Sequence, residues 1–165
     1  MATFVSVLSS KAPPRPTLGT LLVAVATASI ALCVLVLLGM LSGHILLIPP
    51  MAASMALVAG APGLPLSQPR NVIGGQVISA SVGVLVGSVD HSLWAGAVAG
   101  GVALGAMLAT RTSHSPAAAT AVIGALTVDG HTSFVVCAAL AAVVLVAAGW
   151  TRAKVTRSAY PAYWW

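Results

Sequence analysis

Two short segments that begin with proline recur in the two halves of the chain. Pro50-Met-Ala-Ala-Ser54 and Pro116-Ala-Ala-Ala-Thr120 each open a short apolar segment that lies between two longer ones. Short, proline-interrupted segments at matching positions in two halves are typical of the central binding site of a membrane transporter. The pattern therefore predicts movement of a small solute across a membrane.

The chemistry that these segments offer is anion binding by backbone amides. Proline is tolerated in the first helical turn, and the free N–H groups of that turn form a positive pole together with the helix dipole. Ser115 can cap the second pole, and His114 can donate there when protonated. We expect the anion-binding site to be lined by Pro50, Ser54, Ser115, Pro116, Ala117 and Thr120. The alternative is that the prolines merely begin two short helices, with Ser54 and Thr120 bonding back to their own helices.

The most polar stretch in the interior of the chain runs from Ser67 to Gln76. An arginine at a span boundary can simply mark the cytoplasmic surface, which is one interpretation of Arg70. The other is a vestibule that concentrates anions. The residues that would form this inner vestibule, or support the site from behind, are Gln68, Arg70, Asn71, Gln76 and His114.

Other residue patterns give no sign of catalysis or of a bound cofactor. Asp90-His91 and Asp129-Gly130-His131 recur between the apolar segments, but their spacing matches no strong metal signature, so we expect polar loop caps. The chain has no P-loop, no nucleophile elbow and no carboxylate pair within an apolar segment. We expect neither an enzyme nor a metal or cofactor.

The distribution of charge predicts a membrane protein. Only 9 of the 165 residues are Asp, Glu, Lys or Arg, and none lies in the 54 residues between Arg15 and Arg70. A helical span needs about 20 apolar residues, so this stretch is long enough for two. A soluble domain would carry charge on about a quarter of its positions. The basic residues are scattered, so the expected partner is the lipid bilayer and not nucleic acid.

Six apolar segments predict an all-α, polytopic helical membrane protein with four full spans and two short, broken or half-helices. The segments are residues 18–41, 45–60, 71–89, 92–110, 115–128 and 131–150, of which the second and fifth are short. With six crossings and a cytoplasmic amino terminus, all basic residues fall on the cytoplasmic side. Both termini are then cytoplasmic.

Three crossings in each half invert the second half relative to the first. We therefore predict two inverted repeats, residues 18–89 and 92–150, which form a single transmembrane domain over residues 18–150. Residues 1–17 would be a cytoplasmic amino-terminal segment. Residues 151–165 would be a basic and aromatic cytoplasmic tail lying along the inner membrane surface, with Tyr160, Tyr163, Trp164 and Trp165 as interfacial anchors.

Glycines spaced four apart predict close helix contacts in the third and fourth segments. Such spacing lets backbones approach closely in lipid. The contacts could lie within one chain or could build a homo-oligomer, and both remain open. The residues are Gly83, Gly87, Gly96, Gly100, Gly101 and Gly105.

Two ordered motifs resemble the HPP family of small integral membrane proteins. They are GAPGLPLSQPRNVIGGQ at residues 60–76 and TRTSHSPAAATAVIG at residues 110–124. The His-Pro-Pro signature of the family matches His114, Ser115 and Pro116, so serine replaces the central proline. An alanine replaces the glycine expected before Thr120, and Gln76 stands where histidine is common. Plant and cyanobacterial members are associated with nitrite transport, so the resemblance implies nitrite as the substrate.

Taken together, these patterns predict a multi-pass protein of the bacterial inner membrane that moves nitrite or a similar small monovalent anion. A carrier or channel is favoured over a pump, because no nucleotide-binding domain and no buried carboxylate is evident. One alternative is a non-transporting assembly or anchoring subunit. Another is a carrier for a different small solute, such as a weak acid or a metal ion.

Overall fold

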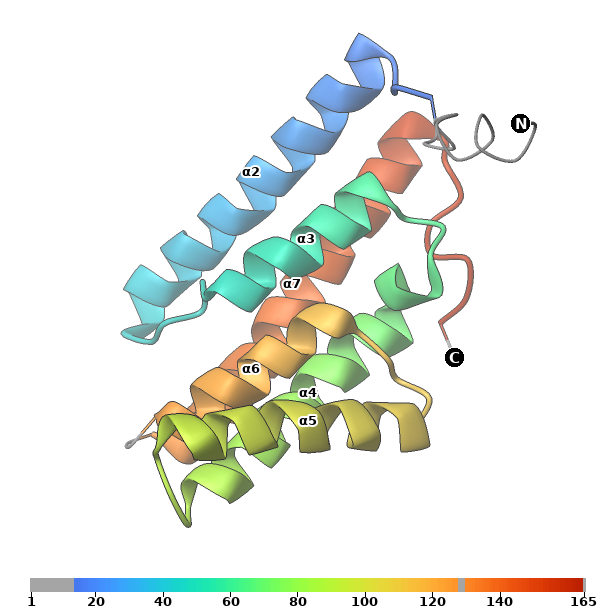
Figure 1. Ribbon diagram of the computed structural model, residues 1–165. Coiled ribbons are helices and arrows are strands. Elements are labelled where there is room, and N and C mark those ends of the chain that lie inside the picture. Colours follow the sequence, from blue (N-terminus) through green and yellow to red (C-terminus); the bar gives the residue numbers. More distant parts are fainter. Residues whose placement is uncertain (1–13, 128–129, 165) are drawn as a thin grey trace, which may run out of the picture.

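The computed structural model describes residues 14–127 and 130–164, and these form an all-helical bundle (Figure 1). No strand occurs in these ranges, so the expected all-α class is confirmed there. Outside the described residues lie residues 1–13, residues 128–129, which include Asp129, and Trp165. The elements are α2 (Leu18–Ser42), α3 (Pro49–Gly60), η1 (Pro65–Ser67), α4 (Pro69–Gly87), α5 (Leu93–Ala109), α6 (Ser115–Leu126) and α7 (His131–Thr156).

Local sequence explains where these helices begin and end. α3, α4 and α6 each carry proline in their first two positions, where its missing N–H is harmless. Gly43 ends α2 with a φ of 69°, a backbone conformation that favours glycine. α7 continues to Thr156, past the expected end at residue 150, and places Lys154 in its last turn, where a cation complements the helix dipole.

Two helices, α2 and α7, are long and apolar enough to cross a membrane, with 25 and 26 residues. α5 has 17 residues and α3 and α6 have 12 each. Most of α2 is exposed, including Leu18, Leu37 and Leu41. Exposed apolar surface of this extent marks a membrane or protein interface, which fits a helical membrane protein.

The helices pack as two groups of three. α2, α3 and α7 contact one another pairwise, and so do α4, α5 and α6. The groups meet where α4 contacts α7, where α3 contacts α6 and, less extensively, where α6 contacts α7. Figure 1 shows α2 and α3 on one side of the molecule and α5 and α6 on the other. Exchanging α2 with α5, α3 with α6, and α4 with α7 turns each of these contacts into a contact of the same set, except that between α6 and α7.

The two ends of the bundle differ in charge. Arg70 donates hydrogen bonds to the carbonyl oxygens of Thr110 and Arg111, so the start of α4 and the end of α5 share one end with the carboxyl-terminal tail. The loops with His44 and Gly130 line a common hollow at the other end. Arg70 and Arg111 therefore lie at the end of the bundle that also holds the carboxyl-terminal tail.

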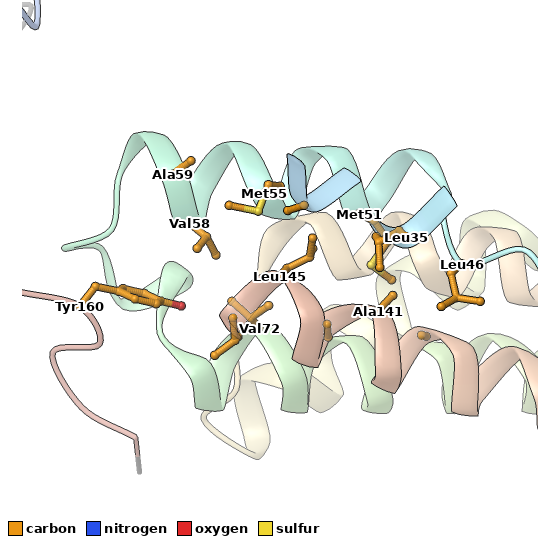
Figure 2. Packing of buried hydrophobic residues seen from close by; sticks show 14 of the residues in the cluster. Leu35, Leu46, Met51, Met55, Val58, Ala59, Val72, Ala141, Leu145 and Tyr160 are labelled. Atoms are coloured by element: carbon orange, nitrogen blue, oxygen red, sulfur yellow. The ribbon is translucent and has the colours of Figure 1, made fainter. Parts of the chain in front are cut away.

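The larger apolar core lies between α2, α3, α4 and α7 (Figure 2). Leu35, Met51, Met55 and Leu145 are fully buried there. Tyr160 closes one end of this cluster and is only 5% exposed, against the expectation that the tail lies along the membrane surface. The tail folds back because Gly149 on α7 leaves room for the ring: a Cβ there would lie 2.8 Å from Tyr160 Cε1.

Four of the six predicted glycines contact another helix of the chain. A Cβ on Gly96 or Gly100 of α5 would lie 3.3 or 3.2 Å from the side chain of Val122 on α6. A Cβ on Gly87 would lie 2.8 Å from the carbonyl oxygen of Ala125, and one on Gly83 would meet the backbone of Ala121. α4 and α6 are thus in backbone contact. By contrast, a Cβ on Gly101 or Gly105 of α5 would meet nothing within 4 Å.

Candidate functional site

Four polar side chains meet in the interior, and all four are fully buried. Ser54 comes from α3, Gln76 from α4, Thr120 from α6, and His114 is the N-cap residue of α6. We call Ser54, Gln76, His114 and Thr120 the central cluster. Buried polar residues in a membrane protein usually face a cavity or a pathway, which makes this cluster the candidate site.

Hydrogen bonds join the central cluster into one chain. Thr120 Oγ1 donates to Gln76 Oε1 at 2.6 Å, and Gln76 Nε2 donates to Ser54 Oγ at 3.0 Å. Ser54 Oγ lies 2.7 Å from His114 Nε2, and His114 Nδ1 lies 2.7 Å from the carbonyl oxygen of Leu66. The cluster therefore links both short helices to α4.

The double glycine before Gln76 allows this arrangement. A Cβ on Gly75 would lie 2.7 Å from His114 Cβ and 2.9 Å from the carbonyl oxygen of Thr112. Any larger residue would push the loop between α5 and α6 off α4. Gly75 thus allows His114 to lie beside Gln76. The sequence analysis did not predict this role for Gly75.

A polar cavity of about 520 Å³ opens at the arginine end of the bundle. Arg70 and Asn71 line it, as the vestibule interpretation expects. Asn71 Nδ2 also donates to the carbonyl oxygen of Ser113 at 2.9 Å, which ties α4 to the residue before His114. The full lining is Pro65, Arg70, Asn71, Arg111, Ser113 and Tyr163.

Four of these cavity residues were not among the predicted site residues. Pro65 belongs to η1, Arg111 and Ser113 to the α5–α6 loop, and Tyr163 to the tail. The available signal was the second motif, since Arg111 and Ser113 directly precede His114 in it. Nothing in the sequence placed Tyr163 there, because its position follows from the docking of the tail.

Gln68 lies outside the cavity lining and braces the loop before α4. Its Nε2 donates to the carbonyl oxygens of Pro62 and Leu64, and its Oε1 accepts a hydrogen bond from the N–H of Ala162. Tyr160 Oη donates to the carbonyl oxygen of Ser67 at 3.0 Å. Burial raises the pKa of the Tyr160 phenol, which keeps this donor protonated.

The remaining predicted residues lie in the first turns of the two short helices. Pro50 and Ala117 are buried, Pro116 is half-buried, and Ser115 is exposed as the first residue of α6. The N-cap position of α6 belongs to His114, whose side chain makes no capping bond. Ser54 also donates back to the carbonyl oxygen of Pro50, so the local bond of the alternative interpretation coexists with the cluster.

Asp90, His91 and His131, at the other end of the bundle, hydrogen-bond to loops and helix ends. Asp90 accepts hydrogen bonds from the N–H and hydroxyl groups of Ser92, which lower its pKa, and Ser92 in turn caps α5. His91 Nδ1 lies 2.9 Å from the carbonyl oxygen of Ala125. The rings of His91 and His131 lie 6.2 Å apart. Each of these groups therefore holds a loop or a helix end.

The fold and the site are those of a polytopic helical membrane protein. Its helices are apolar, α2 exposes a large apolar surface, and a polar cluster is buried between the helices. The family model described as "HPP, transmembrane region" matches residues 13–161. The chain belongs to the HPP transmembrane family.

Two curated relatives are transmembrane proteins of Dictyostelium discoideum. Each is 33% identical to this chain, over 73% and 72% of its length. The matches cover 42% and 45% of the relatives, so the chain spans less than half the length of these proteins. No solved structure matches the chain.

Proposed function

We propose that this protein moves nitrite, or a similar small monovalent anion, across a membrane as a carrier or channel. The observation that carries the proposal is that the arginine cavity and the central cluster adjoin along the chain. Ser113 lines the cavity and is followed in the chain by His114, which belongs to the cluster. A cationic cavity next to a buried polar site suits an anion.

Electrostatics supports the choice of an anion. Arg70 and Arg111 line one cavity, and no acidic residue lies between Met1 and Val89 or from His91 to Val128. A cation would therefore meet repulsion at the mouth, whereas an anion would be concentrated there. Asn71 and Ser113 add polar groups that can replace part of the hydration shell of the ion.

We further propose that the chain crosses the membrane six times as two inverted repeats, with four full spans and two short ones. The symmetric set of helix contacts supports this architecture, because α2, α3 and α4 exchange with α5, α6 and α7. The arginine end would face the cytoplasm with both termini. In transporters of this kind, the binding site lies where the repeats meet near mid-membrane.

Nitrite is proposed from family membership, since plant and cyanobacterial members are associated with nitrite transport. The central proline of the signature is Ser115 here, and Ser115 is exposed beside the first turn of α6. A hydroxyl at this position offers one further donor to an anion. Its loss in Ser115→Ala should weaken binding several-fold, since one hydrogen bond contributes about 1 kcal/mol.

The decisive experiment measures uptake of nitrite, nitrate, formate and chloride into liposomes that contain the purified protein. Arg111→Gln should lower the rate for the transported anion and weaken its dependence on ionic strength. Lys154→Gln is the matched control, because it removes one positive charge that does not line the cavity.

Equal rates for the two variants, with both proteins folded, would refute the role of the cavity. Absence of flux for all four anions would favour the non-transporting subunit.

A further inference from the structure

The hydrogen bonds of His114 fix which of its ring nitrogens carries a hydrogen. A carbonyl oxygen can only accept, so His114 Nδ1, at 2.7 Å from that of Leu66, must donate. In a neutral imidazole the other nitrogen is then an acceptor. His114 Nε2 therefore needs a hydrogen from Ser54 Oγ, which lies 2.7 Å away.

Ser54 has one hydroxyl hydrogen and two acceptors that compete for it. Its Oγ lies 2.8 Å from the carbonyl oxygen of Pro50 as well as 2.7 Å from His114 Nε2. Gln76 cannot help, because its Nε2 already donates to Ser54 Oγ and its Oε1 accepts from Thr120. With neutral His114, one of the two contacts of Ser54 has no hydrogen.

One added proton removes this conflict. When Nε2 is protonated, it donates to Ser54 Oγ, and the Ser54 hydroxyl is free to donate to the carbonyl oxygen of Pro50. Ser54 Oγ then accepts two hydrogen bonds and donates one, which is the full capacity of a hydroxyl group. The central cluster thus has a place for one proton, and that place is Nε2 of His114.

The charge of that proton has no partner among the side chains packed around it. α3, η1 and α6 carry no titratable side chain. The titratable groups on the neighbouring elements are Arg70 of α4, Arg111 of the α5–α6 loop, Tyr160 of the tail, and His131, Cys137, Arg152 and Lys154 of α7, which packs on α4. None of these groups supplies a negative charge at neutral pH. Buried charge is stable only when paired. The counter-charge must therefore come from a bound anion.

We propose that the protein is a proton–anion symporter in which Nε2 of His114 binds one proton for each monovalent anion. This inference rests on the proposed function and adds its coupling. The proton comes from water on one side of the membrane, and it returns to water on the other side together with the anion. The loaded site carries one positive and one negative charge, so a cycle moves no net charge. By linkage, proton and anion each strengthen the binding of the other.

The test uses liposomes that contain the full chain, with the membrane potential set by potassium and valinomycin. Nitrite is the first probe. Nitrate is measured in parallel, because its acid is fully dissociated and does not leak through lipid. We expect an inward proton gradient to drive accumulation of the transported anion, with initial rates that do not depend on membrane potential. A gradient of about one pH unit should sustain about a tenfold anion ratio in one-to-one symport.

His114→Gln identifies the coupling residue, because its amide can donate to Ser54 but cannot titrate. This variant should lose the gradient-driven accumulation, and any remaining flux should follow the membrane potential. His44→Gln is the matched control, since His44 is an exposed histidine whose Nδ1 lies beside the carbonyl oxygen of Ser42 at the opposite end. It should keep both the accumulation and the insensitivity to potential.

Each other outcome overturns a stated part of the inference. Wild-type flux that follows the membrane potential and ignores the proton gradient would overturn the coupling and leave anion transport standing. Accumulation by His114→Gln at the level of His44→Gln would overturn the assignment to His114. Lack of flux for every anion, in folded wild-type protein, would overturn both the transport function and its coupling.

Discussion

Replacing Gly83 by alanine tests the close backbone contact between α4 and α6. A Cβ at Gly83 would lie 2.9 Å from the Cα of Ala121 and closer still to its carbonyl oxygen. These are backbone atoms of α6, so no rotation of a side chain can relieve the clash. The variant must push α6 away from α4 or remain strained.

The expected cost follows from two opposing effects. Forcing one extra methyl group into a well-packed contact destabilises a protein by about 1–3 kcal/mol. Alanine also gains up to about 1 kcal/mol over glycine inside a helix. Gly101→Ala receives the same helical gain but meets nothing within 4 Å, so it is the matched control. The free energy of unfolding should therefore be lower for Gly83→Ala than for Gly101→Ala by about 1–3 kcal/mol.

The assay compares unfolding of the two variants by denaturant in the same detergent. Anion uptake gives a second readout, because a shift of α6 would stretch the 2.6 Å bond from Thr120 to Gln76. Gly101→Ala should unfold no more easily than the wild type and should keep its uptake rate. If the two variants have equal stability, α4 and α6 are not in backbone contact at Gly83 and the described packing is wrong.

Three further predictions concern individual hydrogen bonds. Thr120→Val should lower the free energy of unfolding by about 1–3 kcal/mol, because it leaves the buried Gln76 Oε1 without a donor, whereas Thr151→Val on the exposed face of α7 should cost little. Tyr160→Phe should cost about 1 kcal/mol and speed proteolysis of the tail, with Tyr163→Phe as the control. Burial raises the pKa of Tyr160, so the stability that its hydrogen bond contributes is complete below the usual tyrosine pKa of about 10 and is lost as pH rises through the folded value. Proteolytic protection of the tail, measured against pH, should therefore fall at high pH in the wild type but not in Tyr160→Phe.

Helix positions could be predicted closely because apolar runs and prolines mark them directly. The short segments expected at 45–60 and 115–128 correspond to α3 and α6, each with proline in its first two positions. The start of α3 lies later than expected, since residues 43–48 form the loop after α2. α7 exceeds its expected end because charged residues at a span boundary do not stop a helix that has solvent beyond it.

The members of the central cluster could be named from sequence, but their contacts could not. The two proline motifs indicate Ser54, His114 and Thr120 as site residues, and the polar stretch around Gln76 indicates Gln76. Which atom meets which depends on the register of α4 against α6. That register is set by glycine contacts over the length of α4, and a local pattern carries no information about the facing helix.

The lining of the arginine cavity could be predicted from the sequence even less completely. Arg70 and Asn71 could be expected at a polar mouth, whereas Tyr163 reaches it through a tail that Tyr160 fixes to the loop before α4. The aromatic residues after a basic stretch resemble membrane anchors in sequence. The space left by Gly149 decides instead for burial of Tyr160.

The placement of the central cluster suggests why polar groups, and not apolar ones, join the short helices. Inside each three-helix group, most of the packing is apolar or glycine against backbone, although the bond from Thr120 to Gln76 also joins α6 to α4. Between α3 and α6, where the groups meet, the contact includes the bond from Ser54 to His114. A hydrogen bond can be exchanged for a bond to an ion or to water at small net cost, whereas separated apolar surfaces cannot be compensated in this way.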